Sequence, residues 1–78
     1  MKLEILTPEK RLFNGEVDSV MLPGTLGPFH VLPNHAPIIS SLVEGGKVTC
    51  FTGNQKESFA ITGGFVEVLH NHVTVCVG

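Results

Sequence analysis

The chain has 78 residues, of which 15% are charged, and its formal net charge is −2. This length allows one domain with a small core, which we expect to span residues 1–78. The few basic residues are scattered, so no basic stripe is present to bind nucleic acid. The longest apolar run is far shorter than a membrane span, and the start, MKLEILTPEK, lacks the apolar stretch of a signal peptide. We therefore expect no insertion into lipid and a cytosolic location.

Alternating apolar residues predict short β-strands from the beginning of the chain. Leu3 and Ile5 share one face, and the following TPEKRLF is expected to form a turn with Thr7 as its cap. The same alternation recurs in KVTCFT, SFAIT, FVEVL and VTVCV, at residues 47–52, 58–62, 65–69 and 73–77. In FVEVL it separates Phe65, Glu67 and Leu69 from the two valines.

Turn signals divide these runs about every eight to ten residues, a rhythm typical of short antiparallel strands. They are Asn14-Gly15, Pro23-Gly24, Gly45-Gly46, Gly53-Asn54, Gly63-Gly64 and His70-Asn71. Several strands carry apolar residues on both faces, which favours two packed sheets over one open sheet. The sequence therefore predicts an all-β chain, a two-sheet β-sandwich of about ten short antiparallel strands.

Residues 23–37, PGTLGPFHVLPNHAP, form a stiff and nearly uncharged stretch. Pro33 and Pro37 fix their own φ angles and hold the residues before them extended, which places His35 on a rigid corner. Two interpretations of this histidine remain open. Its imidazole either bonds the nearby backbone in a structural role or is presented to a partner.

The sequence contains no motif for nucleophilic catalysis or for phosphate binding, so we predict no catalytic residues and no cofactor. Cys50 and Cys76 are expected to be reduced, small hydrophobic residues rather than a disulfide. His70 and His72 form a His-x-His pair, but it straddles a predicted turn and no further ligands follow, so we predict no metal site.

The order of motifs resembles the epsilon subunit of the bacterial rotary (F-type) ATP synthase, which is called delta in mitochondria. The resemblance covers essentially the whole chain. Its residues are Gly15, Val17 and Val20; Gly24 and Gly27; Pro33, His35, Ala36 and Pro37; and Gly63, Gly64, Glu67, Val68, Val73, Thr74 and Val75.

The resemblance implies a β-sandwich at the foot of the central stalk that binds the gamma subunit and the ring of c subunits. Such a domain is not catalytic, rotates with both partners and helps couple proton flow to ATP synthesis at the cytoplasmic face of the inner membrane. Carried over position by position, the candidate c-ring contacts are Gly24, Thr25, Leu26, Gly27, Pro28 and Phe29. The candidate gamma contacts are Thr7, His35, Ala36, Pro37, Ile38 and Ser40.

The chain departs from the family in two ways. Family members often carry an acidic residue where this chain has Pro28, which leaves Leu26 and Phe29 for a ring contact. Most bacterial members also continue into a helical hairpin that extends to inhibit ATP hydrolysis, whereas this sequence stops at Gly78, so we expect no inhibition of that type. Two alternatives remain: a small enzyme or metal-binding β-barrel built around His70 and His72, and a free-standing β-sandwich adaptor for another partner.

Overall fold

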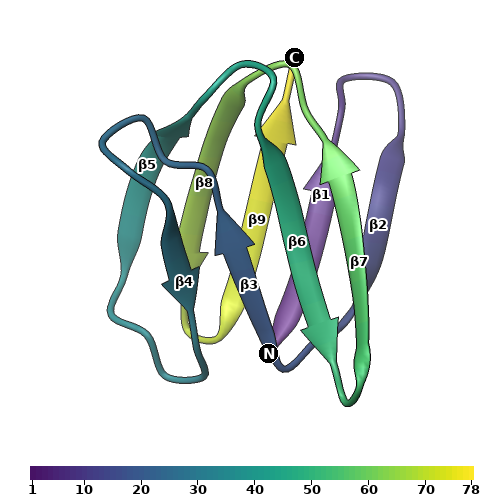
Figure 1. Ribbon diagram of the computed structural model, residues 1–78, viewed down its shortest axis with the longest axis vertical. Helices are drawn as coiled ribbons and strands as arrows, with labels where there is room; N and C mark the ends of the chain where they lie inside the picture. The colour runs from purple at the N-terminus through teal and green to yellow at the C-terminus, as the bar shows by residue number, and fades with distance from the viewer.

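The structure, a computed structural model, describes residues 1–78 and contains nine β-strands and no helix (Figure 1). In chain order the strands are β1 (Lys2–Leu6), β2 (Arg11–Glu16), β3 (Ser19–Leu22), β4 (Phe29–Val31), β5 (Ile38–Leu42), β6 (Lys47–Thr52), β7 (Gln55–Ala60), β8 (Gly64–Leu69) and β9 (His72–Val77). Since the chain forms no helix, it has no helical segment long and apolar enough to cross a membrane.

The strands form two sheets that pack face to face. The five-stranded sheet has the order β2-β1-β9-β8-β5, and the four-stranded sheet has the order β4-β3-β6-β7. In Figure 1 the four-stranded sheet lies in front, with β4 and β5 at the left and β7 and β2 at the right. The predicted two-sheet β-sandwich is confirmed, and its nine strands are close to the number expected.

One strand pair differs from the predicted antiparallel arrangement. β1 and β9 run parallel in the middle of the five-stranded sheet, with Lys2 opposite His72 and Leu6 opposite Cys76. A parallel pair needs a long connection, and here the whole chain between the two terminal strands supplies it. Apolar alternation predicts the face on which each residue lies but not the strand beside it, so this one parallel pair among otherwise antiparallel strands was not predicted.

The core lies between the two sheets and is built mainly from alternate residues of the strands. Val48 and Cys50 face inward from β6, and three valines face inward from β9, as the alternation predicts. The rings of Phe13 and Phe59 meet edge to face at 5.5 Å and close the sandwich between β2 and β7. Fifteen buried residues form one cluster: Leu3, Ile5, Val17, Val20, Leu22, Val31, Leu42, Val48, Cys50, Ile61, Val66, Val68, Val73, Val75 and Val77.

The tight turns lie where they were expected, with one exception. His70 and Asn71 join β8 to β9 with positive φ angles of 51° and 60°, as a two-residue hairpin turn requires. The prediction of a turn at Asn14-Gly15 is wrong, because both residues lie inside β2. A Cβ at Gly15 would stand 3.4 Å from the Phe13 ring, so this aromatic side chain covers the gap that the glycine leaves in the strand.

The connections between strands gather at two ends of the sandwich. At the upper end of Figure 1 lie the β1–β2, β3–β4, β5–β6 and β7–β8 connections and the C-terminus. At the lower end lie the N-terminus and the β2–β3, β4–β5, β6–β7 and β8–β9 connections. The glycine loop of residues 23–28 and the proline corner of residues 32–37 are therefore at opposite ends of the molecule.

Candidate partner-binding surfaces

The β3–β4 connection, residues 23–28, is a tight loop whose shape depends on Gly24. The N–H of Gly27 donates to Gly24 O at 3.0 Å and closes a turn. Gly24 is buried, and a Cβ there would stand 2.7 Å from Gly27 O and 2.9 Å from the Phe29 ring. Any side chain at this position would force the loop or the ring to move, so the packing of the loop itself fixes its geometry.

Hydrogen bonds tie this loop to β5, the edge strand of the other sheet. The N–H of Thr25 donates to Ser41 O at 3.0 Å, and the hydroxyls of the same two residues lie 2.6 Å apart. Beside them, the N–H of Val43 donates to Pro23 O at 2.8 Å. A loop held in this way loses little backbone freedom when it binds a partner.

Leu26 and Phe29, the two apolar side chains expected at a ring contact, have opposite environments. Leu26 stands at the tip of the loop and is fully exposed, at 103% of its reference surface. Phe29 is half-buried and packs against the core, with its ring over Gly24. Only Leu26 therefore reaches outward without a rearrangement of the loop.

At the lower end, the β4–β5 connection forms the corner predicted from its prolines. The backbone N–H of His35 donates to Leu32 O at 3.1 Å, and its ring Nδ1 donates to Ala36 O at 2.7 Å. One ring nitrogen of His35 thus bonds the nearby backbone, as the structural interpretation of this residue predicted. Its Nε2 has no partner within the chain, so the half-buried ring still offers one polar atom to a second molecule.

A reciprocal pair of hydrogen bonds fastens this corner to the β8–β9 turn. The backbone N–H of Asn34, a residue with a positive φ of 67°, donates to Asn71 Oδ1 at 2.6 Å. In return, Asn71 Nδ2 donates to Asn34 Oδ1 at 3.1 Å. The two asparagines, which we call the asparagine clamp, restrain the corner that carries His35.

The outer face of the five-stranded sheet, which points away from the core, carries an apolar hollow at its upper end. Strand pairing places Phe65 beside Cys76, and Cys76 beside Leu6, so the three side chains share this face. Together with Thr7 and neighbouring residues they line a shallow hollow of about 500 Å³. Phe65 is half exposed in it, an unusual position for a large aromatic side chain that has no partner.

A second hollow, of about 370 Å³, lies lower on the same face between β5 and β8. Ile39 and Leu69 line it, and they are 73% and 42% exposed. Glu67 lies directly opposite Ile39 and supplies the carboxylate at this position. The β5 and β8 part of the outer face is therefore mainly apolar.

The other part of the outer face, on β1, β2 and β9, carries a charged network. Nε2 of His72 donates to Glu4 Oε1 at 2.8 Å, and Arg11 Nη2 lies 3.5 Å from Glu4 Oε2. The hydrogen bond from His72 is the main cause that lowers the pKa of Glu4 below its ordinary value. Burial opposes this shift, and the positive charges of Lys2 and Arg11 add to it.

The histidines and cysteines occupy separate environments. His70 lies in the β8–β9 turn whereas His72 bonds Glu4, and no group of three His, Cys, Asp or Glu side chains converges to hold a metal ion.

Cys50 and Cys76 are free thiols. Burial, and after it the negative charge of Glu57, raises the pKa of the Cys50 thiol.

Comparison with known proteins identifies the family. Residues 1–78 match the model of a family described as the beta-sandwich domain of the ATP synthase delta/epsilon chain. The chain belongs to this family. Its fold and the spacing of its glycine and proline motifs agree with that membership.

Curated members of the delta/epsilon family are similar along most of this chain. The chain is 49% identical over 74 residues to the ATP synthase epsilon chain of Protochlamydia amoebophila, covering 94% of this chain and 50% of that one. It is 39% identical over 75 residues to that of Leptospira interrogans, with coverage of 96% and 58%. For Chlorobium limicola the identity is 43% over 70 residues, with coverage of 90% and 80%. The chain thus spans half of the first of these relatives and 58% of the second.

Two solved structures share the fold. A chain of the mitochondrial ATP synthase of Euglena gracilis, from its OSCP/F1/c-ring assembly, superposes with a TM-score of 0.87 at 22% identity, covering 96% of this chain and 48% of that one. A chain of the central stalk/c-ring of the Tetrahymena thermophila mitochondrial ATP synthase gives a TM-score of 0.80 at 18% identity, with coverage of 97% and 61%. At these identities the likeness shows the fold alone.

The contact residues expected for a delta/epsilon sandwich are divided between the two ends of the molecule. The ring candidates, residues 24–29, lie in the upper β3–β4 loop and at the start of β4, and His35, Ala36 and Pro37 lie in the lower corner. Thr7 lies at the upper end, where its hydroxyl accepts from the N–H of Lys10 at 3.0 Å and donates to Lys10 O at 3.1 Å. Because its own turn occupies this hydroxyl, Thr7 presents chiefly its apolar part to a partner.

Two of the expected gamma contacts on β5 face the core rather than solvent. Ile38 and Ser40 are half-buried on the side that faces the core, whereas Ile39, which the sequence did not single out, projects from the outer face. Phe65 and Leu69, which were not among the candidates either, also project from the outer face. The alternation of FVEVL had placed them on one face, and their exposure makes that face the outer one.

Proposed function

We propose that this chain is the β-sandwich part of a rotor subunit in the central stalk of an F-type ATP synthase. In this role it binds the gamma subunit and the ring of c subunits and helps couple proton flow to ATP synthesis, without being catalytic itself. Membership of the delta/epsilon family supports the proposal. The rotor would hold the sandwich at the cytoplasmic face of the inner membrane.

The gamma subunit would lie on the outer face of the five-stranded sheet, from the Thr7 turn to the His35 corner. The observation that carries this assignment is the exposure of Ile39, Phe65 and Leu69 on one face, at 73%, 49% and 42%. Apolar side chains grouped in this way are typical of the core of a protein interface. Ile38 and Ser40 would support the contact from the inner side of β5 rather than make it.

The ring of c subunits would meet the upper loop, residues 24–29, which stands at the end of the sandwich rather than on its face. The loop is stiff, because Gly24 packs under the Phe29 ring and Thr25 bonds Ser41. A stiff contact suits a rotor, in which torque must pass without the loop yielding.

The gamma assignment is tested by size-exclusion chromatography with light scattering on this chain mixed with the gamma subunit of the same organism. We expect a one-to-one complex that His35→Ala weakens roughly tenfold. His30→Ala is the matched control, because His30 is exposed on β4 and pairs with Met21, on the outer face of the other sheet. Absence of a complex at every salt concentration would overturn the proposal. Equal weakening by His35→Ala and His30→Ala would show that gamma does not bind specifically at the outer face of the five-stranded sheet.

A further inference from the structure

Three glutamates lie on the outer face of the five-stranded sheet, and two of them have a cation within the chain. Glu4 accepts from His72 at 2.8 Å and lies 3.5 Å from Arg11. Glu16, opposite the outward-facing lysine of β1, lies 3.1 Å from the N-terminal ammonium group. Glu67 is exposed and takes part in no ion pair. It is therefore the one carboxylate of this face whose charge is compensated by water alone.

The surroundings of Glu67 are mainly apolar. On β5 it lies opposite Ile39, and along β8 it stands between Phe65 and Leu69 on the same face. We call these three exposed apolar residues the apolar patch. On the other side of Glu67 lies Thr74 of β9, and the lysine and the arginine of the outer face lie beyond it, on β1 and β2. The carboxylate thus stands inside the apolar patch with no lysine or arginine beside it.

We propose that Glu67 selects what can cover the apolar patch. A gamma subunit that covers the patch brings a lysine or arginine side chain to this carboxylate, whereas a second copy of the chain is excluded. The identity of the partner rests on the proposed function, and the exclusion of a second copy concerns the chain alone.

Coverage by a partner changes the environment of the Glu67 carboxylate. In the free chain the group is exposed and solvated. A partner that buries Ile39 and Leu69, which line a hollow together with Glu67, removes water from the carboxylate, and an unpaired charge in such surroundings is unfavourable. A basic side chain at this point compensates the charge and allows the apolar contacts around it to form. The carboxylate thus rejects an apolar surface that fits the patch in shape but carries no cation.

A second copy of the chain does not meet this requirement. Exposed apolar side chains grouped on one face favour association, and a two-fold axis would pack the apolar patch of one copy on that of the other. Because Glu67 lies inside the patch, such a dimer brings two carboxylates close together where water is removed. The cations of the outer face cannot relieve this repulsion, since they lie outside the patch and Arg11 already pairs with Glu4.

The first measurement is the molar mass of the chain alone, by size-exclusion chromatography with light scattering over a wide range of concentrations. The wild type should remain monomeric. Glu67→Gln keeps the size of the side chain and removes its charge, and two glutamine amides can bond each other across a two-fold axis. This variant should therefore dimerise with a dissociation constant at least about tenfold below that of the wild type.

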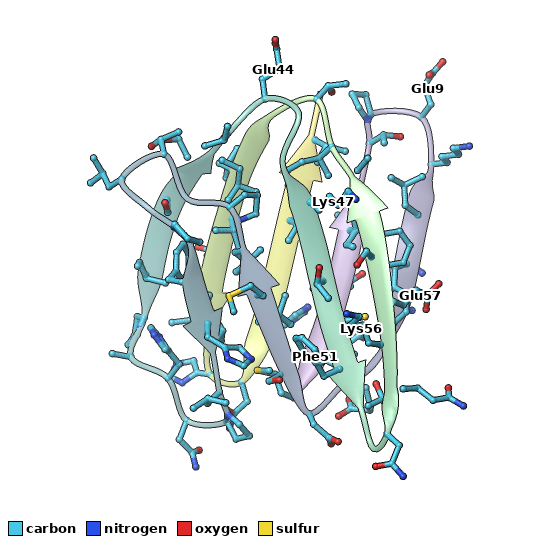
Figure 2. All side chains as sticks on the ribbon, in the orientation of Figure 1. Glu9, Glu44, Lys47, Phe51, Lys56 and Glu57 are labelled. Atoms are coloured by element: carbon cyan, nitrogen blue, oxygen red, sulfur yellow. The ribbon has the colours of Figure 1, made fainter.

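Glu57→Gln is the matched control for both measurements. Glu57 is also an exposed glutamate within a strand and without an ion pair, but it lies on β7 of the other sheet (Figure 2). This variant should remain monomeric. If Glu67→Gln stays as monomeric as the wild type, or if Glu57→Gln associates to the same extent, the exclusion of a second copy by Glu67 is overturned.

The second measurement is the affinity of the chain for the gamma subunit of the same organism. Glu67→Gln should bind about tenfold more weakly than the wild type, whereas Glu57→Gln should bind as the wild type does. Raising NaCl from about 50 to about 500 mM should weaken the binding of the wild type more than that of Glu67→Gln, because salt screens the attraction between opposite charges.

The binding of gamma to the wild type separates the two proposals. If the wild type binds gamma and Glu67→Gln binds equally or more tightly, no cation meets this carboxylate, so the selection by Glu67 is overturned and the proposed function stands. If the wild type does not bind gamma, the proposed function fails, and the molar mass of Glu67→Gln still decides whether Glu67 excludes a second copy. The far-UV circular dichroism of Glu67→Gln should match that of the wild type, because the carboxylate is exposed and holds no ion pair.

Discussion

Replacing Gly64 with alanine is expected to remove about half of the stability of the protein, because this position has no room for a methyl group. Gly64 begins β8, pairs with Val77 of β9 and has a φ of +132°. A Cβ there would overlap Cys76 O and lie 3.0 Å from Val77 Cα. Both atoms belong to the backbone of a central strand, so neither moves away by a change of rotamer.

The expected loss has two parts. A non-glycine residue with a φ of this sign carries roughly 1–3 kcal/mol of backbone strain. Forcing a methyl group into a packed site costs roughly 1–3 kcal/mol more. The sum, about 2–6 kcal/mol, compares with an unfolding free energy of about 4–12 kcal/mol for a chain of this length.

The assay is urea unfolding followed by far-UV circular dichroism, because the chain has no Trp and no Tyr for fluorescence. Gly45→Ala is the matched control: its φ is +81°, and nothing lies within 4 Å of the added Cβ. It should lose about 1 kcal/mol from backbone strain alone. If Gly64→Ala unfolds at the same urea concentration as Gly45→Ala, the reasoning is refuted, because Gly64 alone has a backbone contact with β9 and also has the less favourable φ.

Three further predictions concern the surfaces. Asn71→Gly removes both bonds of the asparagine clamp but keeps a residue that tolerates positive φ, so amide exchange at Asn34 should rise with little change in the unfolding midpoint. Cys76 should react with a thiol reagent faster than Cys50, because Cys50 is buried and its thiol pKa is raised, and bound gamma should protect Cys76. The urea midpoint should fall as the pH drops below about 4.5, because the pKa of Glu4 is lowered in the folded state. The stability that its carboxylate contributes is fully present above the ordinary pKa of the group and is lost as the pH falls through the folded-state pKa.

Each of these predictions has its own control. His70→Gly relaxes the same turn without touching the clamp, and faster exchange at Asn34 in that variant would show that turn flexibility, not the clamp, governs the corner. Cys76→Ser should leave a single slowly reacting thiol. Glu4→Gln should flatten the pH dependence of the midpoint, whereas Glu44→Gln, which removes a carboxylate without an ion pair, should leave it unchanged.

The fold was predictable from the sequence to the extent that apolar alternation records which side of each strand faces the core. Val48 and Cys50 are buried as their pattern indicates, and the turn at His70-Asn71 has the positive φ that its residues suggest. Asn14-Gly15 shows the limit of the turn signal, since glycine also occurs inside an edge strand when a neighbouring ring fills its space. The parallel pairing of β1 and β9 depends on contacts between the two ends of the chain, which no local pattern contains.

The candidate contact surfaces were predictable only in outline. The loop and the corner follow from their prolines and glycines. Leu26 and Phe29 are both apolar and close in sequence, and packing against Gly24 and the core half-buries Phe29 alone. Ile38 and Ile39 are adjacent and identical in type, so the sequence cannot tell which one faces outward. These choices depend on tertiary packing, which local patterns do not record.

The two proposed contacts share one structural element, which bears on how a force at one of them reaches the other. The upper loop is bonded to β5 through Ser41, and the lower corner leads directly into β5 at Ile38. β5 pairs with β8 along its whole length, and β8 is joined to the same corner through the asparagine clamp at its far end. A displacement of the loop relative to the corner would therefore have to shear the β5–β8 pairing or break the clamp. If the ring holds the upper loop and gamma holds the outer face, this pair of strands is the shortest stiff path between them.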